Sequence, residues 1–279
     1  MSDLPSPGDL LRAYGKPAKK SLGQNFLTDV PLLDKIIKVA GVGPESRVLE
    51  IGPGPGGLTV RLLASGAEVL ALEKDPACVQ HLQAHLGAHP RFRVVEADAL
   101  GEGLAAAVGD PPRVVVGNLP YHVATPILFA LLGLEVMPRR LCLMFQKEVA
   151  DRIVVTGRDR NASALGVGVA MTHRAQRLMV LPPGAFTPAP KVHSAVLLLE
   201  ARESPLATRT ELPVVRRIVQ AAFGQRRKTL RNALKSMSAD VDAWLERAKV
   251  DPRVRPEDLD AGDYVQLARS MASHEGVSV

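Results

Sequence analysis

The fold of this chain is decided by one stretch, Arg47–Thr59, which reads RVLEIGPGPGGLT. Its first five residues suit a buried strand, and the glycines that follow let the backbone turn sharply and approach a ligand closely. Gly52, Gly54 and Gly57 satisfy the pattern G-x-G-x-x-G, which joins a strand to a helix through a glycine loop. The stretch therefore predicts a nucleotide-binding α/β domain.

Strand-like and helix-like segments alternate on both sides of this stretch, which indicates a mostly parallel sheet covered by helices. The apolar runs that predict strands are 47–51, 68–72, 93–97, 113–116 and 140–145, with a closing hairpin from 178–181 and 195–200. The segments with helical periodicity are 31–39, 58–64, 76–86 and 147–155.

The strand pattern stops after about Ser204, and the remaining chain has only helical patterns, over 212–236 with an interruption near Gly224, 241–248 and 256–272. We therefore expect two domains. The first, 1–205, includes an N-terminal extension of residues 1–30, and we expect the first 20 residues to begin flexibly. The second, 206–279, is a small all-helical domain.

Special residues end four successive predicted strands: Gly52, Glu73, Asp98 and Asn118. The carboxyl ends of parallel strands meet at one crevice, where Glu73 would hold ribose hydroxyls and Asp98 would accept from an adenine amino group. Prolines within the glycine loop remove amides that a pyrophosphate needs. The pattern therefore favours S-adenosylmethionine over a nicotinamide dinucleotide, whose hydride chemistry would also need a catalytic acid that we do not find.

The stretch Asn118–Tyr121 follows an apolar strand and reads NLPY. It suits a flat slot for a planar ring that carries an exocyclic amine. Tyr121 would stack on the ring, while the Asn118 side-chain oxygen and the Leu119 carbonyl would accept the two amine protons. The alternative is a strand end closed by an ordinary turn, with Pro120 in the turn and Tyr121 simply packed.

The chain is basic, with a net charge of +6 and a pI of about 9.5, and the charge is concentrated late in the sequence. Between Leu212 and Ser236 there are seven Lys and Arg residues and no acid, which favours a phosphate-binding surface over a merely solvated helix. Lys19 and Lys20 add charge near the cofactor site or form a basic tail. The candidate RNA-binding residues are Lys19, Lys20, Arg226, Arg227, Lys228 and Arg231.

Other features indicate the compartment and argue against a metal. The chain has two cysteines and no visible secretory signal or membrane-spanning run, so we expect a cytoplasmic protein without disulfides. Cys78, His81, His85 and His89 fall on one predicted helix at spacings that suit zinc. No second ligand cluster supports a metal, and we interpret them as a solvent-facing stripe.

Five segments resemble the ribosomal RNA adenine N6-dimethyltransferases, in order and spacing, across nearly the whole chain. They are Lys19–Leu27, Glu50–Gly57, Asn118–Tyr121, Phe186–Val192 and Phe223–Asn232. The resemblance is greatest to the bacterial group that acts on the small subunit. One departure is His122, where that group usually has Asn after the tyrosine.

This resemblance implies a Rossmann-like class I methyltransferase sheet with a helical C-terminal domain, and S-adenosylmethionine as the cofactor. The implied reaction is dimethylation of N6 of two adjacent adenines in a 16S rRNA hairpin, within an immature small subunit, by a monomer without a metal. The resemblance places cofactor contacts at Asn25, Leu27, Gly52, Gly54, Glu73, Asp98 and Asn118.

Catalysis in this hypothesis depends on positioning and electrostatics rather than on a strong base. Tyr121 and Phe186 would sandwich the extruded base. The alternative for Phe186, which lies in a Pro-rich loop, is that it only anchors this loop. Other hypotheses are a large-subunit enzyme of the antibiotic-resistance type, a DNA adenine methyltransferase, and an assembly factor that acts by binding. DNA enzymes typically have an acid in the place of Asn118, and the intact slot argues against a factor without activity.

Overall fold

The structure is a computed structural model that describes residues 4–109 and 114–275, and only the backbone of residues 272–275. The chain forms two compact units. The first unit is Met1–Ala150 with Gln176–Glu200, and the second is Asp151–Ala175 with Ala201–Val279. Within the described ranges, no helix is both long and apolar enough to cross a membrane.

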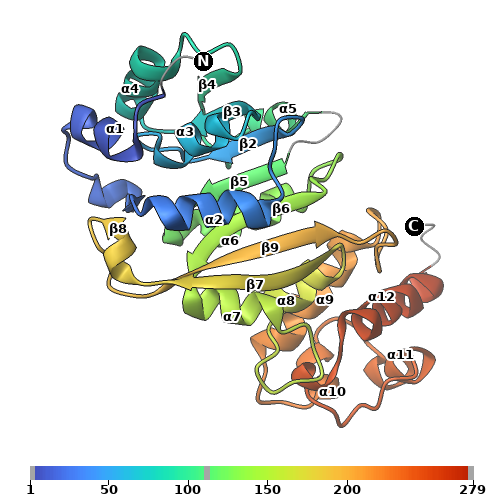
Figure 1. The fold of residues 1–279 in the computed structure, drawn as a ribbon. Helices are drawn as coiled ribbons and strands as arrows, with labels where there is room; N and C mark the ends of the chain where they lie inside the picture. Colours follow the sequence, from blue (N-terminus) through green and yellow to red (C-terminus); the bar gives the residue numbers. More distant parts are fainter. Residues whose placement is uncertain (1–3, 110–113, 276–279) are drawn as a thin grey trace. The chain divides into compact units, whose positions relative to one another are not determined.

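The first unit is built on a seven-stranded sheet with the order β4-β3-β2-β5-β6-β9-β7 (Figure 1). Strands β2 to β6 pair in parallel with their neighbours, and β9 pairs antiparallel with β6. The parallel pairing confirms the predicted α/β class. The strands are β2 (Arg47–Ile51), β3 (Glu68–Glu73), β4 (Phe92–Glu96), β5 (Val114–Asn118), β6 (Arg140–Gln146), β7 (His173–Leu181) and β9 (Ser194–Ala201).

The four helices predicted from periodicity in this region are present, and Gly103–Val108 and Tyr121–Leu131 form two more that were not predicted. Asp29 and Asp75 cap the N-termini of α2 and α4 with their side chains, and each is followed closely by a proline that suits the first turn. The expected strand start at Arg113 lies outside the described residues. The helices of this region are α2 (Val30–Ala40), α3 (Gly57–Ala64), α4 (Pro76–Leu86), α5 (Gly103–Val108), α6 (Tyr121–Leu131) and α7 (Lys147–Val154).

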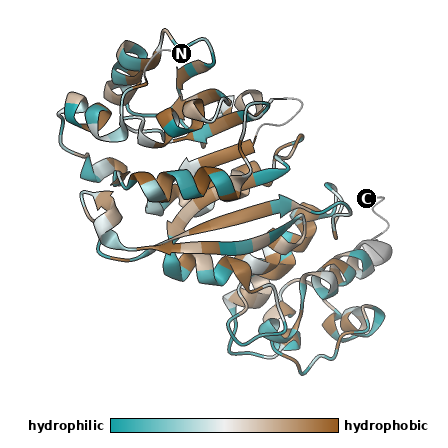
Figure 2. Ribbon diagram, in the orientation of Figure 1, coloured by the Kyte–Doolittle hydropathy of each residue, from teal (hydrophilic) through white to brown (hydrophobic). Residues whose placement is uncertain are grey.

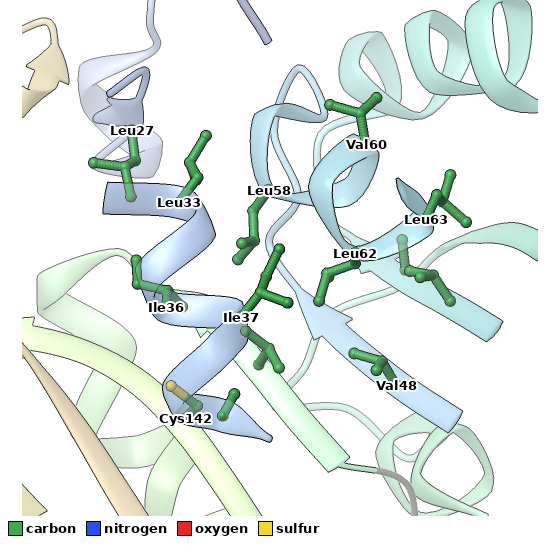
Figure 3. Close-up of a cluster of buried hydrophobic side chains, with 14 of the residues drawn as sticks. Leu27, Leu33, Ile36, Ile37, Val48, Leu58, Val60, Leu62, Leu63 and Cys142 are labelled. Carbon is green, nitrogen blue, oxygen red and sulfur yellow. The ribbon is translucent and has the colours of Figure 1, made fainter. Parts of the chain in front are cut away.

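The core of the first unit forms where α2 and α3 pack together beside the sheet. Leu33, Ile36 and Ile37 follow a helical spacing along α2 and are at most 7% exposed. They share one apolar cluster with Leu58 and Leu62 of α3 (Figure 3). Figure 2 shows mostly apolar colours on the central strands, whereas the helices alternate between polar and apolar residues. Each of these side chains contributes about 1.5–3 kcal/mol through its burial.

The N-terminal extension contains a helix that the sequence analysis did not predict. Helix α1 (Pro7–Tyr14) begins with a reciprocal capping box between Ser6 and Asp9. Leu10 and Tyr14 are at most 4% exposed, because α1 packs against α3 and α4. The expectation of a flexible start is therefore wrong for this segment, whose tertiary contacts order it.

The extension continues through a short turn and a two-stranded sheet. The 3-10 helix η1 (Lys20–Leu22) is followed by β1 (Phe26–Leu27), which pairs antiparallel with β8 (Phe186–Thr187). Strand β8 follows η2 (Pro183–Ala185) in the connection between β7 and β9. The two strands of the expected hairpin are therefore neighbours in the sheet, but a long excursion joins them.

The second unit is helical apart from the strand ends that enter it, and its core contains Trp244 and Tyr264. The Trp244 Nε1 donates to the Leu267 carbonyl at 2.9 Å. Asp260 and Asp263 form reciprocal backbone-to-carboxylate hydrogen bonds, so the helix expected over 256–272 is divided there. The elements are α8 (Ala164–Ala170), α9 (Leu212–Gly224), α10 (Leu230–Leu234), α11 (Val241–Arg247), η3 (Pro256–Asp258) and α12 (Ala261–Glu275).

The division into units differs from the expected boundary between residues 205 and 206. Asp151–Ala175 joins the second unit, although it comes before β9 in the sequence. The reason is packing, because Val167, Ala170 and Met171 are at most 1% exposed and belong to the helical apolar cluster. Local sequence pattern does not reveal this, because α8 is short and lies between two strands.

Candidate active site

A pocket in the first unit lies at the carboxyl ends of the parallel strands. Its lining includes Gly52 after β2, Glu73 of β3, Asp98 after β4 and Asn118 of β5. The parallel register of these strands brings together four residues that are far apart in the sequence. Asn25, Leu27, Gly54, Leu119, Pro120 and Tyr121 also line the pocket, as do Pro7 and Leu11, whose part the sequence analysis missed because it had not predicted α1.

The glycine loop adopts a backbone that other residues would strain. Gly52, Gly54 and Gly56 have φ values of +69°, +56° and +97°. A Cβ atom on Gly54 would also lie 2.9 Å from the Phe26 ring. The loop therefore needs glycine both for its turn and for its close approach to the N-terminal segment.

Glu73 is positioned by backbone amides on both carboxylate oxygens. Its Oε2 accepts from the Gly54 N–H at 3.0 Å, and its Oε1 accepts from the Asp75 N–H at 2.8 Å. The side chain is only 7% exposed, and this burial raises its pKa against the opposing effect of the two amides. The geometry holds the carboxylate at the pocket wall, where it has lone pairs left for ligand hydroxyls.

Asp98 is held in an ion pair that the sequence analysis did not anticipate. The Lys74 Nζ lies 2.7 Å from Asp98 Oδ2, and the Leu100 N–H donates to Oδ1 at 2.9 Å. The lysine hydrogen bond is the main reason that the pKa of Asp98 is lowered. A carboxylate oxygen accepts more than one hydrogen bond, so Asp98 retains the capacity to accept from an exocyclic amine.

Asn118 is oriented by the N-terminal segment. Its Nδ2 donates to the Asn25 backbone oxygen at 2.7 Å, which leaves Oδ1 without a partner in the described part of the chain. The next residues, Leu119 and Pro120, lead into α6, where Tyr121 is the first residue. The Tyr121 hydroxyl is hydrogen-bonded to the Ser194 Oγ at 2.6 Å, which fixes the ring at its far end. The amide acceptor and the aromatic ring therefore lie together at one wall of the pocket.

Phe186 is not among the residues that line the pocket. It is 4% exposed, lies opposite Leu27 in the β1–β8 pair, and belongs to the apolar cluster of the first unit. Its burial and its pairing with Leu27 are those of a packed anchor, which was the alternative interpretation, while stacking of Phe186 on the base stays a prediction. Sequence reasoning could not separate the two roles, because both require an aromatic residue in this loop.

Glu50 is a buried acid that the sequence analysis did not assign. It is 1% exposed and accepts a hydrogen bond from the Thr59 Oγ1 at 2.7 Å on Oε2. Burial raises the pKa of Glu50 to about 8, with a smaller contribution from the negative charge of Glu73. The pair spans the glycine loop from β2 to α3, so it ties together the two ends of that loop.

The candidate RNA-binding residues differ in whether their side chains already have an interaction partner within the protein. Lys19 is paired with Asp75 at 2.7 Å, and Arg231 with Asp242 at 2.6 Å. Arg226 contacts Glu257 and the backbone oxygen of Arg160. The exposed side chains without a partner in the described residues are those of Lys20, Arg227 and Lys228.

Two of the possible zinc ligands, Cys78 and His81 of α4, pack against Tyr14 of α1. Cys78 is fully buried and its Sγ lies 3.4 Å from the Tyr14 hydroxyl. His81 is 9% exposed and contacts the Tyr14 ring edge-on at a centroid distance of 5.4 Å. The expected solvent-facing stripe is therefore wrong for these two residues. Over residues 4–109 and 114–271, no group of three His, Cys, Asp or Glu side chains is arranged to hold a metal.

The parallel sheet and the pocket at its strand ends define a class I methyltransferase that uses S-adenosylmethionine. The comparison with known families is specific within that class. The family model described as "Ribosomal RNA adenine dimethylase" matches residues 15–273. The chain therefore belongs to the ribosomal RNA adenine dimethylase family, and it is an rRNA methyltransferase.

Curated relatives and solved structures agree with this assignment. The chain is similar to "Ribosomal RNA small subunit methyltransferase A" of Dinoroseobacter shibae, with 44% identity over 97% of this chain and 98% of the relative. The protein of the same name from Xanthobacter autotrophicus is 41% identical over 98% of this chain and 96% of its own.

Two solved structures are similar over most of the chain. A dimethyladenosine transferase from Plasmodium falciparum has a TM-score of 0.74 and 26% identity, over 90% of this chain and 98% of that chain. The 23S rRNA methyltransferase ErmE has a TM-score of 0.66 and 26% identity, over 88% of this chain and 99% of that chain.

The pocket residues fit the cofactor of this class. Gly54 lines the pocket without a Cβ atom, which would lie 2.9 Å from the Phe26 ring, and the Glu73 carboxylate is held at the wall by two amides. Asp98 supplies a further acceptor at the neighbouring strand end. These are the groups that a ribose and an adenine amine require.

Proposed function

We propose that the protein dimethylates N6 of two adjacent adenines in a hairpin of 16S rRNA during assembly of the small ribosomal subunit. The observation that carries the proposal is the orientation of Asn118, whose nitrogen is engaged by Asn25 while its oxygen remains available at the pocket. The small-subunit names of the relatives support the choice of RNA.

The chemistry follows from the nucleophile. When bound, S-adenosylmethionine supplies an electrophilic methyl group on a sulfonium. The adenine N6 lone pair is delocalised into its ring, so the enzyme must favour a pyramidal nitrogen. Asn118 Oδ1 and the Leu119 carbonyl would accept the two N6 protons, while Tyr121 stacks on the base. Positioned acceptors of this kind lower the barrier without a strong base, and the proton of the methylated amine is released to water.

The cofactor would be held by the strand-end residues that the sequence analysis assigned. Glu73 would accept from the ribose hydroxyls, and Asp98 from the adenine amine. The loop around Gly52 and Gly54 would allow close approach of the backbone, and Asn25 and Leu27 would form the N-terminal wall. Their joint presence in the pocket lining supports this arrangement.

RNA binding is proposed for the basic segment of the second unit. Arg227 and Lys228 follow α9, are exposed, and have no side-chain partner in the described residues. They are therefore free to neutralise phosphates, whereas Arg226 and Arg231 would first have to leave their acidic partners. The proposal includes action by a monomer in the cytoplasm on an immature subunit, without a metal, since a sulfonium methyl group needs no metal for activation.

The test is methyl transfer from labelled S-adenosylmethionine to immature 30S subunits that lack the modification, with product nucleosides resolved by mass. We expect N6,N6-dimethyladenosine in 16S rRNA with the wild type and almost none with Asn118→Ala. Asn161→Ala, at an exposed position of the second unit, is the matched control and should behave as wild type.

The other outcomes would redirect the proposal. Label in 23S rRNA would place the protein with the resistance-type enzymes, which the curated relatives do not favour. Intact cofactor binding without any label would indicate a factor that acts by binding and would refute the role of Asn118.

A further inference from the structure

Asp75 has a buried carboxylate that the proposed chemistry does not use. It is 0% exposed and caps α4 by accepting from the Ala77 N–H at 3.0 Å. The Lys19 Nζ donates to its Oδ1 at 2.7 Å, and the Gln24 Nε2 donates to its Oδ2 at 3.0 Å. A buried charge is costly without such partners, so the two side chains and the carboxylate depend on one another.

Gln24 also closes the segment that it anchors. Its Oε1 accepts from the Lys19 N–H at 2.8 Å, while the Lys19 carbonyl accepts from the Leu22 N–H at 3.1 Å. Both ends of the Gln24 carboxamide are therefore used, one within the segment and one on Asp75. Lys19–Gln24 thus forms a compact turn that is fastened to the start of α4.

This turn leads directly to Asn25, the residue that orients the side-chain amide of Asn118. Asn25 follows Gln24, and its backbone oxygen accepts from Asn118 Nδ2 at 2.7 Å. On the other side, the Asp75 N–H donates to Glu73 Oε1 at 2.8 Å. Asp75 therefore stands between the carboxylate proposed for the ribose and the segment that orients the proposed acceptor.

We propose that Lys19, Gln24 and Asp75 form a latch that holds the N-terminal segment at the cofactor pocket and so positions Asn118 for methyl transfer. The inference rests on the proposed function for the role of Asn118. It makes Lys19 and Asp75 positioning residues, since they act through Asn25 and Glu73. It also gives Lys19 a function in holding the segment that forms part of the pocket wall, in place of the RNA contact expected from its charge.

Two readouts separate the latch from the proposed function: calorimetric binding of S-adenosylmethionine, and kcat for methyl transfer to 30S subunits. Lys19→Met should weaken cofactor binding about tenfold and lower kcat about tenfold, the loss expected for one charge-assisted hydrogen bond. Lys19→Arg keeps the charge, so its cofactor affinity and its kcat should both be within about twofold of the wild-type values. Lys16→Met, at an exposed lysine of the same extension, is the control and should leave both unchanged.

A double-mutant cycle tests whether the two charges act as a pair. Asp75→Asn keeps an acceptor for the helix cap but loses the charge, so it should weaken binding in the same direction. Lys19→Met combined with Asp75→Asn should lose less than the product of the two single effects, because the second change removes a charge already left unpaired.

Unchanged cofactor affinity and kcat in both Lys19→Met and Asp75→Asn would overturn the latch, as would equal losses in Lys19→Met and Lys19→Arg. Thermal unfolding of each variant shows whether it folds. If Asp75→Asn does not fold, the comparison of the Lys19 variants decides. The Lys19 side chain is 46% exposed, so its replacement should not prevent folding. A wild type that binds the cofactor but methylates no RNA would refute the proposed function and leave the binding test of the latch in force.

Discussion

Asn118 Nδ2 lies 2.7 Å from the backbone oxygen of Asn25, and this contact joins the end of β5 to the N-terminal extension. A carbonyl oxygen accepts only from a donor, so the amide nitrogen must face Asn25 and the amide oxygen must face away from it. The extension therefore determines which atom of Asn118 is presented at the pocket.

Replacement of Asn118 should separate chemistry from cofactor binding. Asn118→Ala removes the acceptor, and we expect kcat to fall by about 100-fold or more, the usual cost of losing one positioned polar group. Asn118→Asp should also be impaired, because a carboxylate oxygen would face the Asn25 oxygen. Single-turnover methyl transfer and calorimetric binding measure the two effects. An active Asn118→Ala would contradict the assignment.

Phe186 should prove to be a residue of the core rather than of the slot. Phe186→Ala should lower the free energy of unfolding by about 3–5 kcal/mol, because it empties a well-packed site. Phe186→Leu should cost less than about 1.5 kcal/mol and keep wild-type kcat. Denaturant unfolding and methyl transfer on the same samples check both values. A Phe186→Leu enzyme with normal stability and strongly reduced kcat would instead support stacking on the base.

Glu50 should make stability depend on pH. Its pKa is raised to about 8 from the usual 4.5, mainly by burial, so the folded chain keeps a proton that the unfolded chain loses. The free energy of unfolding should therefore fall as the pH rises from about 4.5 to about 8, by at most about 1.4 kcal/mol per unit.

Denaturant unfolding at pH 5, 6.5 and 8 measures this slope. Glu50→Gln stays neutral and should flatten it, while Glu45→Gln, at an exposed position, should not. Glu73, whose pKa is also raised, should contribute a slope of the same sign in Glu50→Gln, and His81, whose pKa is lowered by burial, a slope of the opposite sign. Equal slopes in the wild type and Glu50→Gln would contradict the prediction.

The basic segment of the second unit should contribute unequally to RNA binding. Arg227→Ala combined with Lys228→Ala should weaken binding and reduce the salt dependence of log K by roughly one per charge removed. Arg231→Ala should have a smaller effect, because its guanidinium already pairs with Asp242. Filter binding to a 16S rRNA hairpin over a range of salt concentrations tests this. If Arg231→Ala weakened binding as much per charge removed as the double variant, the Arg231–Asp242 ion pair would have to open in the complex.

Local pattern was enough for most of the sheet and for the position of the site. The helix expected over 76–86 and observed as Pro76–Leu86 has its cap, its proline and its apolar spacing all within the segment. The convergence of Glu73, Asp98 and Asn118 on one pocket was likewise predictable from position alone, because parallel strands present their carboxyl ends at one edge. The family itself was also evident from its motifs.

The sequence by itself therefore determined the fold class, the cofactor pocket and the family, since these depend on residue types at short, regular spacings. Only the tertiary structure decided the partners of individual side chains. It paired Lys19 with Asp75, buried Phe186 beside Leu27, and ordered α1 against α3 and α4. Such contacts join residues far apart in the chain, and they depend on burial and register that no local pattern contains.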